Sequence, residues 1–496
     1  MTKGPDNSER SKTGIPGLDD VLNGGLVPRR LYLVEGEPGC GKTTVSLHYL
    51  LEGVRSGEKC LYITLSETKD ELIAGAQSHG WPLDGIEILE LAADQRDLDG
   101  SKQVTMYSPS EIELTETIKR VLEGVERVNP TRVAIDSLSE LRLLAQNSLR
   151  YRRQILALKQ FFNGRNCTVL LVDDRTSESA DIQLQSIAHG VLSLEQIAPL
   201  YGAARRRLRV VKFRGTDYRG GYHDFNIYRG GLEVYPRLVA AEHLAPFERE
   251  PVKSGVTALD ELLGGGPDRG TSTLLIGPAG SGKSTLAVQY AVAAAQRGDH
   301  AAIFIFDESR ATLEARSESL GIRFAAGTRA GQIQVQQIDP AEVSPGEFAF
   351  RVRRAVERDK ARIIVIDSLN GYINAMPGER YLTAQLHELL TYLGNRGVTT
   401  LMVVAQQGMI YSSGQAPVDT SYLADSVVLL RYFEDRGKVK KAISVVKKRS
   451  GMHEQSIREL HFDHNGIHLS DPLMRYRGIF TGVPVEIGEG EPVGKA

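Results

Sequence analysis

Two short glycine-rich segments carry residues at the spacing that phosphate binding requires. Residues 36–44 read GEPGCGKTT and residues 277–285 read GPAGSGKST, and both match the pattern G-x-x-x-x-G-K-[ST]. The glycines let backbone N–H groups curl around phosphate oxygens, and a helix starting at the lysine adds partial positive charge. Each segment therefore predicts a site for ATP, with the lysine reaching the outer phosphates. The predicted nucleotide contacts are Gly36, Gly39, Gly41, Lys42, Thr43 and Thr44, and Gly277, Gly280, Ser281, Gly282, Lys283, Ser284 and Thr285.

An aspartate closes an apolar segment downstream of each phosphate loop. RVAIDSLSE places Asp136 there, and RIIVIDSLN places Asp367. Carboxylate and hydroxyl oxygens suit Mg²⁺, so the sequence predicts that Thr43 and Asp136, and likewise Ser284 and Asp367, hold this ion. An acidic residue after a strand can also be a cap or a solvated loop residue. Its recurrence in both halves favours the metal interpretation.

Hydrolysis also needs a group that orients or deprotonates water. The apolar segment after each phosphate-loop helix ends in acidic residues, Glu67 in ITLSET and Asp307 with Glu308 in FIFDES. In an open α/β sheet, catalytic groups lie beyond the carboxyl ends of strands. We expect Glu67 and Glu308 to activate water, with Asp307 beside the latter. The alternative is a carboxylate favoured by a helix N-terminus.

A pair of basic residues recurs near the end of each half. VVKFRG contains Lys212 and Arg214, and VVKKRSG contains Lys447 and Arg449. Residues two apart on a strand share a face, so each pair projects together. Such a pair is commonly a solvated sheet edge, but its duplication suggests a clamp on a neighbouring subunit's nucleotide. The run RRRLR, residues 205–209, is interpreted as a solvated or subunit-facing strand, with nucleic-acid contact as the alternative.

The elements that must position these residues are duplicated. The stretch from Thr13 returns from Ser254, and Lys42 and Lys283 lie 241 positions apart (283 − 42), which is a domain length. Apolar segments such as LYLVEG, CLYITL, RVAID and TVLLVDD alternate with amphipathic helices, and STLLIG, AAIFIF, RIIVID and TTLMVVA follow suit. This alternation predicts an α/β fold with two tandem domains, each a mostly parallel twisted sheet covered by helices on both faces. The predicted limits are residues 1–245 and 246–485, with a polar tail at 486–496.

Composition restricts the function classes. The 496 residues are 41% hydrophobic and 25% charged, with a formal net charge of -2. This balance gives no general attraction to nucleic acid, and no apolar run approaches the about 20 residues of a membrane span. The N-terminus lacks a signal peptide's apolar core, so we expect a cytoplasmic protein. Three scattered cysteines indicate buried thiols rather than disulfides or a metal cluster, and Cys40 lies inside a phosphate loop.

With these residues located, the sequence resembles the KaiC family, the circadian-clock ATPases of the RecA-like superfamily. The resemblance runs from about Thr13 to about Val485. It rests on the lead-ins TGIPGLD and SGVTALD, both phosphate loops, the segments IDSLSE and IDSLN, and the endings KFRG and KKRSG. It implies a homohexamer of two rings with ATP between adjacent subunits. The first ring would hydrolyse ATP and the second would phosphorylate itself on adjacent hydroxyl residues. The positions that would contact the neighbour's phosphates are Lys212, Arg214, Lys447 and Arg449.

The chain departs from the family pattern in several places. Ser66 and Asp307 replace one glutamate of each family pair. Ser421 stands at the first phosphoacceptor position, with Thr420 before it, and Tyr422 stands at the second. The short polar tail is not expected to recruit a KaiA-type activator. A KaiB-like or other signalling protein is the partner that the resemblance implies, although residues 91–110 differ from the clock proteins.

Three functions remain open from the sequence, one of which is a nucleotide-holding scaffold with little turnover. The first is an ATP-driven, self-phosphorylating signalling protein with serine/threonine autokinase activity in its second half. The alternative is a DNA-dependent ATPase similar to RecA, RadA or the DnaB helicase. The net charge and the lack of a separate DNA-binding module favour the first.

Overall fold

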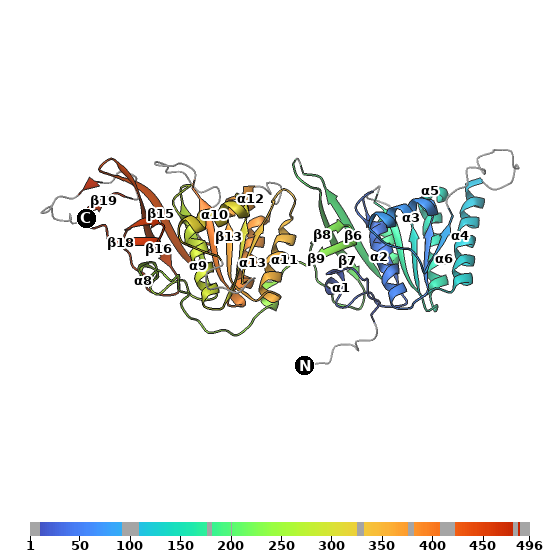
Figure 1. Cartoon of the computed structure of the whole chain (residues 1–496). Helices are drawn as coiled ribbons and strands as arrows, with labels where there is room; N and C mark the ends of the chain where they lie inside the picture. Colours follow the sequence, from blue (N-terminus) through green and yellow to red (C-terminus); the bar gives the residue numbers. More distant parts are fainter. Residues whose placement is uncertain are drawn as a thin grey trace. The chain divides into compact units, whose positions relative to one another are not determined.

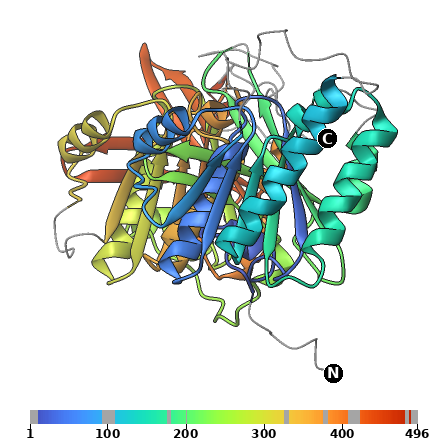
Figure 2. The same ribbon diagram turned by 90° about the vertical axis from the view of Figure 1, so that its right-hand side faces the viewer.

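The computed structural model describes residues 10–91, 109–175, 181–199, 201–324, 332–374, 381–406, 422–479 and 485–486. The chain divides into two units, Met1–Arg237 and Leu238–Ala496, and each contains one nine-stranded sheet (Figure 1). Helices lie along both faces of the strands (Figures 1 and 2). Each unit is therefore a layered α/β structure, as the repeat predicted.

The first unit builds its sheet from short, largely buried strands. Its order is β3-β2-β4-β5-β1-β6-β7-β8-β9, parallel from β3 to β6 and antiparallel from β6 to β9. The strands are β1 (Leu31–Gly36), β2 (Cys60–Thr64), β3 (Ile86–Glu90), β4 (Arg132–Asp136), β5 (Thr168–Asp174), β6 (Gly190–Ile197), β7 (Arg205–Phe213), β8 (His223–Tyr228) and β9 (Gly231–Tyr235). The helices are α1 (Leu18–Val21), α2 (Lys42–Arg55), α3 (Lys69–Ser78), α4 (Pro109–Val128), α5 (Leu138–Ala145), α6 (Ser148–Phe162) and α7 (Asp181–Ile187).

Two hydrophobic cores flank this sheet because successive strand residues point to opposite faces. Tyr32 and Val34 of β1 pack with α1 and α2 in one core. Leu31 and Leu33 of the same strand pack with α4, α5 and α6 in the other. Burial on both sides explains why the strands read as unbroken apolar runs.

The second unit repeats this plan. Its order is β12-β11-β13-β14-β10-β15-β16-β17-β18, with antiparallel pairing again confined to the last four strands. The strands are β10 (Ser272–Gly277), β11 (His300–Ile305), β12 (Ile333–Gln337), β13 (Ala361–Asp367), β14 (Thr399–Ala405), β15 (Ser426–Asp435), β16 (Lys438–Lys448), β17 (Arg458–Asp463) and β18 (Gly466–Pro472), with β19 (Tyr476–Arg477) and β20 (Val485–Glu486) as a separate pair. The helices are η2 (Ala240–Glu242, a 3₁₀ turn), α8 (Thr257–Leu262), α9 (Lys283–Gln296), α10 (Arg310–Ser319), α11 (Pro345–Glu357), α12 (Leu369–Asn374) and α13 (Leu382–Asn395).

The predicted fold class is confirmed: the chain holds two tandem RecA-like α/β domains. The basic segments predicted as late strands are β7 and β16, and both pair antiparallel at the added end of a sheet. None of the described helices is both long enough and apolar enough to cross a membrane.

Candidate functional site

The two phosphate loops connect β1 to α2 and β10 to α9, at the carboxyl ends of central strands. Gly41 precedes Lys42 at φ 106°, where an L side chain is strained, and a Cβ there would lie 2.7 Å from Cδ1 of Ile227. Gly282 repeats both features, with φ 105° and a Cβ that would lie 2.2 Å from Cζ of Phe462. Both helices therefore need glycine at the residue before the lysine.

Lys42 fills the first loop. Its Nζ donates to the carbonyls of Gly36 at 3.0 Å and Glu37 at 2.8 Å, and it lies 2.8 Å from Oδ1 of Asp174. Only 7% of the lysine side chain is exposed. A phosphate entering the loop would compete with these contacts for the same ammonium group.

Thr43 and Asp136 lie together beside this lysine. Oγ1 of Thr43 donates to Oδ2 of Asp136 at 2.7 Å, and the hydroxyl of Tyr62 donates to the same oxygen at 2.6 Å. Burial raises the pKa of the Asp136 carboxyl, while these two hydroxyl donors oppose the rise. A hydroxyl and a carboxylate oxygen thus meet at the end of β4, where the sequence predicted a metal site.

Glu67 lies just past the end of β2, between this site and α3. Its backbone is fixed by Thr64, whose Oγ1 donates to the Glu67 carbonyl at 2.6 Å and accepts from its N–H at 3.1 Å. The side chain itself is exposed. Desolvation raises the pKa of the Glu67 carboxyl, and the charges of Asp136 and Glu71 raise it further. A raised pKa is suited to accepting a proton near neutral pH.

The second loop holds its lysine differently. Nζ of Lys283 donates to the carbonyl of Pro278 at 2.7 Å. Asp174 is level with Gly36 in the first sheet, and Ala405 occupies the equivalent place beside Gly277 in the second. Burial lowers the pKa of Lys283 to about 8, which only the charge of Asp367 opposes.

The carboxylates around the second loop also make new contacts. Burial raises the pKa of Asp367 to about 6, and the hydroxyl of Ser284 donates to it. Oγ of Ser368 donates to Oδ2 of Asp307. Both Asp307 and Glu308 contribute charge at Asp367, so acidic residues gather at the second site as Glu67, Asp136 and Asp174 do at the first.

Glu308 is bound by an arginine. Nη1 of Arg316 lies 2.8 Å from Oε2 of Glu308, and Nη2 lies 2.9 Å from Oε1. The pair is therefore bidentate and charge-assisted. Arg316, Asp174 and Tyr62 are not among the site residues predicted from the sequence. Asp174 at least carries a recognisable signal, since TVLLVDD ends in acidic residues like the strands before Asp136 and Asp367.

The other predicted nucleotide contacts lie in the loops or in the first turns of the following helices. Ser281 is fully buried and its Oγ lies under Gly277, so its side chain points away from the loop surface. Only the backbone of Ser281 is left to contact a phosphate. The remaining members of this set are Gly39, Thr44, Gly280 and Thr285.

Mg²⁺ fits the donor set at both sites. Each supplies one hydroxyl and one carboxylate oxygen, and Mg²⁺ characteristically takes few protein oxygens and completes its octahedron with water and phosphate. No group of three or more His, Cys, Asp or Glu side chains able to hold a metal occurs in the part of the chain that the structure describes. The residues that would hold it are Thr43 and Asp136, and Ser284 and Asp367.

The two basic pairs lie level with the amino-terminal ends of the central parallel strands, whereas the phosphate loops of their own units lie at the carboxyl ends. The N–H of Arg214 donates to the His189 carbonyl at 3.1 Å, and the N–H of His189 donates to the Leu31 carbonyl at 2.8 Å. Arg214 is therefore level with the start of β1, whereas the phosphate loop follows its end. Six strand residues span about 20 Å, so this side chain cannot reach the loop of its own unit.

The second unit shows the same arrangement. Arg449 donates through its N–H to Asp425, and Asp425 donates to Ser272 at the start of β10, both at 2.9 Å. The guanidinium of Arg214 donates to the Ser186 carbonyl at 2.9 Å, and that of Arg449 to the Tyr422 carbonyl at 3.1 Å. Lys212 and Lys447 likewise donate to backbone carbonyls, of Gln185 and Ala424, at 2.7 Å.

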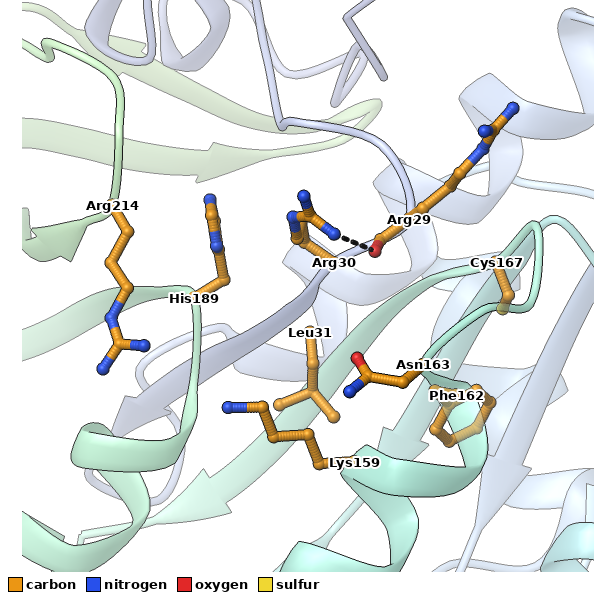
Figure 3. A pocket seen from close by; sticks show the side chains of 9 residues that line it. All are labelled: Arg29, Arg30, Leu31, Lys159, Phe162, Asn163, Cys167, His189 and Arg214. Carbon is orange, nitrogen blue, oxygen red and sulfur yellow. Dashed lines mark hydrogen bonds between the residues drawn. The ribbon is translucent and has the colours of Figure 1, made fainter.

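Arg214 also lines a pocket of about 190 Å³ (Figure 3). Arg29, Arg30, Lys159 and His189 lie around it, and none of its nine lining residues is acidic. The charge and position of this pocket suit an anion approaching the amino-terminal edge of the sheet. The run at 205–209 does not add to it: it forms part of β7, where Arg207 pairs with Glu195 at 2.9 Å.

The predicted phosphoacceptors Thr420 and Ser421 lie outside the described residues. The next residue, Tyr422, is described, and 54% of it is exposed. Its carbonyl is the group that Arg449 contacts.

Comparison with known proteins agrees with this duplicated site. The family model described as "ATPase: KaiC" matches residues 11–239 and again residues 252–473. The chain is 25% identical over 497 residues to the circadian clock protein KaiC3 of Synechocystis sp. (strain ATCC 27184 / PCC 6803 / Kazusa), covering 98% of this chain and 96% of the relative. It is 28% identical over 491 residues to the circadian clock oscillator protein KaiC of Parathermosynechococcus lividus, covering 97% and 89%. The corresponding values for KaiC of Synechococcus elongatus (strain ATCC 33912 / PCC 7942 / FACHB-805) are 27% over 502 residues, 98% and 95%. With a KaiC-type ATPase domain in each half, the chain belongs to the KaiC family.

Proposed function

We propose that this protein is a Mg²⁺-dependent ATP hydrolase that assembles as a cytoplasmic homohexamer of two rings and signals to a protein partner, of the KaiB-like or another class. The observation that carries the proposal is the contact of Thr43 with Asp136 beside Lys42, with Glu67 at the next strand end. The pair of Thr43 and Asp136 recurs in the second domain as Ser284 and Asp367 beside Lys283. This is the constellation that phosphoryl transfer to water requires.

Each residue then has a defined task. Lys42 leaves the loop carbonyls and contacts the outer phosphates, while the loop N–H groups hold the phosphate oxygens. Thr43 and Asp136 would hold Mg²⁺, which would supply charge that offsets the phosphate oxygens. Glu67 accepts the proton of the attacking water as the new P–O bond forms and the bond to the bridging oxygen breaks.

The test is ATP turnover by the intact chain and by the Glu67→Gln variant. Glutamine keeps the size of the side chain but cannot accept the proton, so first-site turnover should fall about 100-fold, with ATP still bound. Unchanged turnover would exclude Glu67 as the base. Negligible turnover in the unaltered chain would indicate a nucleotide-holding scaffold instead.

We further propose that Lys212 and Arg214, and likewise Lys447 and Arg449, contact the phosphates of an adjacent subunit. Two observations support this. The basic residues lie at the ends of the strands opposite their own phosphate loop, and the pocket beside Arg214 is lined by no acidic residue. Mixing Lys212→Ala/Arg214→Ala chains with Lys42→Ala chains tests this. Interfaces that pair an intact loop with an intact basic pair should recover hydrolysis only if the contact is made between subunits.

The second domain is the proposed serine/threonine autokinase, with Ser421 and Thr420 as acceptors. Arg449 of the basic pair contacts the carbonyl of Tyr422, the residue that follows Ser421 in the sequence. Mass spectrometry after incubation with Mg²⁺ and ATP should find one phosphate here, which Ser421→Ala removes or moves to Thr420. No phosphate at either residue would contradict the proposal.

The DNA-dependent alternative makes a different prediction. A motor of that kind should bind single-stranded DNA tightly with ATP, and the binding should weaken steeply with salt. A gel shift at low salt should show no such complex.

A further inference from the structure

The helices that follow the two proposed water-activating glutamates are equivalent, residue for residue. α3 and α10 are each ten residues long, and Glu67 and Glu308 precede them at the same distance. Thr68 caps α3 by accepting from the N–H of Glu71, and Ser309 caps α10 by accepting from the N–H of Thr312. Corresponding positions on these helices can therefore be compared directly.

One position on these helices differs in a way that reaches the site. Arg316 lies on α10 and binds both oxygens of Glu308, at 2.8 and 2.9 Å. The equivalent residue on α3 is Gly75, which has no side chain, and a Cβ there would meet nothing within 4 Å. The first site thus lacks the arginine, and a side chain could start at Gly75 without a clash at its Cβ.

The presence of this arginine changes the charge around the second site. The positive charge of Arg316 acts on Asp367 as well as on Glu308, and it opposes the rise of the Asp367 pKa. At the first site Gly75 supplies no such charge, and the charges of Asp136 and Glu71 raise the pKa of Glu67. A carboxylate whose two oxygens both accept from a guanidinium is held in place, and neither oxygen is turned toward a water molecule.

We propose that Arg316 is a positioning residue that withdraws Glu308 from the attacking water and so makes the second site a slow hydrolase, which keeps its γ-phosphate for transfer to a hydroxyl group. This rests on the proposed function, since it assumes that each site hydrolyses ATP through its glutamate. Water and a side-chain hydroxyl compete for the same γ-phosphoryl group. Slowing the first reaction favours the second without any new catalytic group.

The experiment measures turnover by the full chain in a Glu67→Gln background, where hydrolysis reports the second site. Arg316→Ala should raise kcat about tenfold, because it frees Glu308 as a proton acceptor, and leave the KM for ATP unchanged. Arg316→Lys keeps the charge but not the two-point contact, so its kcat should lie between that of the Glu67→Gln parent and that of Arg316→Ala. Adding Glu308→Gln to Arg316→Ala should abolish the gain.

The reciprocal change supplies a matched control. Gly75→Arg in a Glu308→Gln/Asp307→Asn background should lower first-site turnover, because it places a guanidinium at the position equivalent to Arg316, where an added Cβ meets nothing within 4 Å. If Arg316→Ala binds ATP normally but turns over no faster, or if the gain survives Glu308→Gln, the proposal is wrong. A chain in which Glu67→Gln changes no turnover would instead refute the proposed function itself.

Discussion

The ammonium of Lys42 lies 2.8 Å from the carboxylate of Asp174, while at the second site Ala405 takes the aspartate's place. The lysines of the two phosphate loops therefore have different contacts in the structure. In the first domain a nucleotide must displace a carboxylate from the lysine. In the second it meets a buried lysine held by one carbonyl.

Replacing Asp174 should strengthen nucleotide binding at the first site. Asp174→Ala frees Lys42 and removes a negative charge near the phosphates, so ATP affinity should rise about tenfold, the equivalent of about 1.4 kcal/mol. Titration with a fluorescent ATP analogue in a Lys283→Ala background measures it. Conversely, Ala405→Asp, measured in a Lys42→Ala background, should weaken ATP binding at the second site. Weaker binding in Asp174→Ala would show that the aspartate contacts the nucleotide or its metal.

Acid should destabilise the first domain through His48. This side chain is buried and accepts from the N–H of Leu232 at 3.2 Å, and burial lowers its pKa to about 4. The unfolded chain has the ordinary value of about 6.5 and binds the proton first as pH falls. This contribution is complete above about pH 6.5 and is lost as pH falls towards 4, by about 2 kcal/mol at pH 5.

The second domain supplies the matched variant, because Gln289 occupies the equivalent position on α9. His48→Gln keeps an acceptor for Leu232 and cannot be protonated. Denaturant unfolding at pH 7.5 and pH 5 should show a smaller loss of stability for the variant than for the unaltered chain. Equal losses would show that other groups control the acid sensitivity.

A buried arginine, Arg132, should contribute far more stability to the folded protein than an exposed arginine. Arg132 is 3% exposed and donates to Glu58 and to the carbonyls of Lys12 and Tyr49. Arg132→Met should lower the free energy of unfolding of the first domain by about 3 kcal/mol, because it leaves those acceptors unpaired.

The control is Arg362, which pairs with Asp299 at 3.3 Å on the second domain's surface and is 53% exposed. Arg362→Ala should cost less than about 1 kcal/mol. Thermal unfolding of both variants checks the contrast. Similar losses would show that burial of the Arg132 network adds nothing.

The three cysteines should be unreactive in the native protein. All are buried, and burial raises the pKa of Cys60 to about 11, that of Cys167 to about 12, and that of Cys40 above its usual range. The thiolate is the reactive form, so iodoacetamide at pH 8 should label them only after denaturation. Rapid native labelling of Cys40, detected by mass spectrometry, would instead make the first loop redox-sensitive. Cys40→Ser, which copies Ser281, should bind ATP normally.

The fold could be predicted because its signals are local. Apolar runs between amphipathic helices predict the parallel strands, and the basic residues interpreted as lying on strands lie on or next to β7 and β16. The phosphate loops and the aspartates at the ends of β4 and β13 also depend on short-range spacing. The contact of Thr43 with Asp136 then follows from the strand order that such a sheet adopts.

The contacts of individual side chains could not be predicted in the same way. Asp174 meets Lys42 because β5 lies beside β1, and Arg316 meets Glu308 because two helical turns bring it back to the strand end. Neither contact could be predicted from the sequence of one domain taken alone. Once the halves are aligned through their strands, Gly75 against Arg316 and Asp174 against Ala405 become the positions where one copy of the fold differs chemically from the other.

The position of β1 gives the strand a mechanical consequence. It is the middle strand of nine, with the phosphate loop at its carboxyl end and, across two backbone hydrogen bonds, Arg214 at its amino end. The phosphate loop and Arg214 are therefore joined by a strand about 20 Å long, held by ladders on both sides, rather than by a linker. In a closed ring of such chains these strands would connect consecutive nucleotides in series, so that each site senses the occupancy of the next.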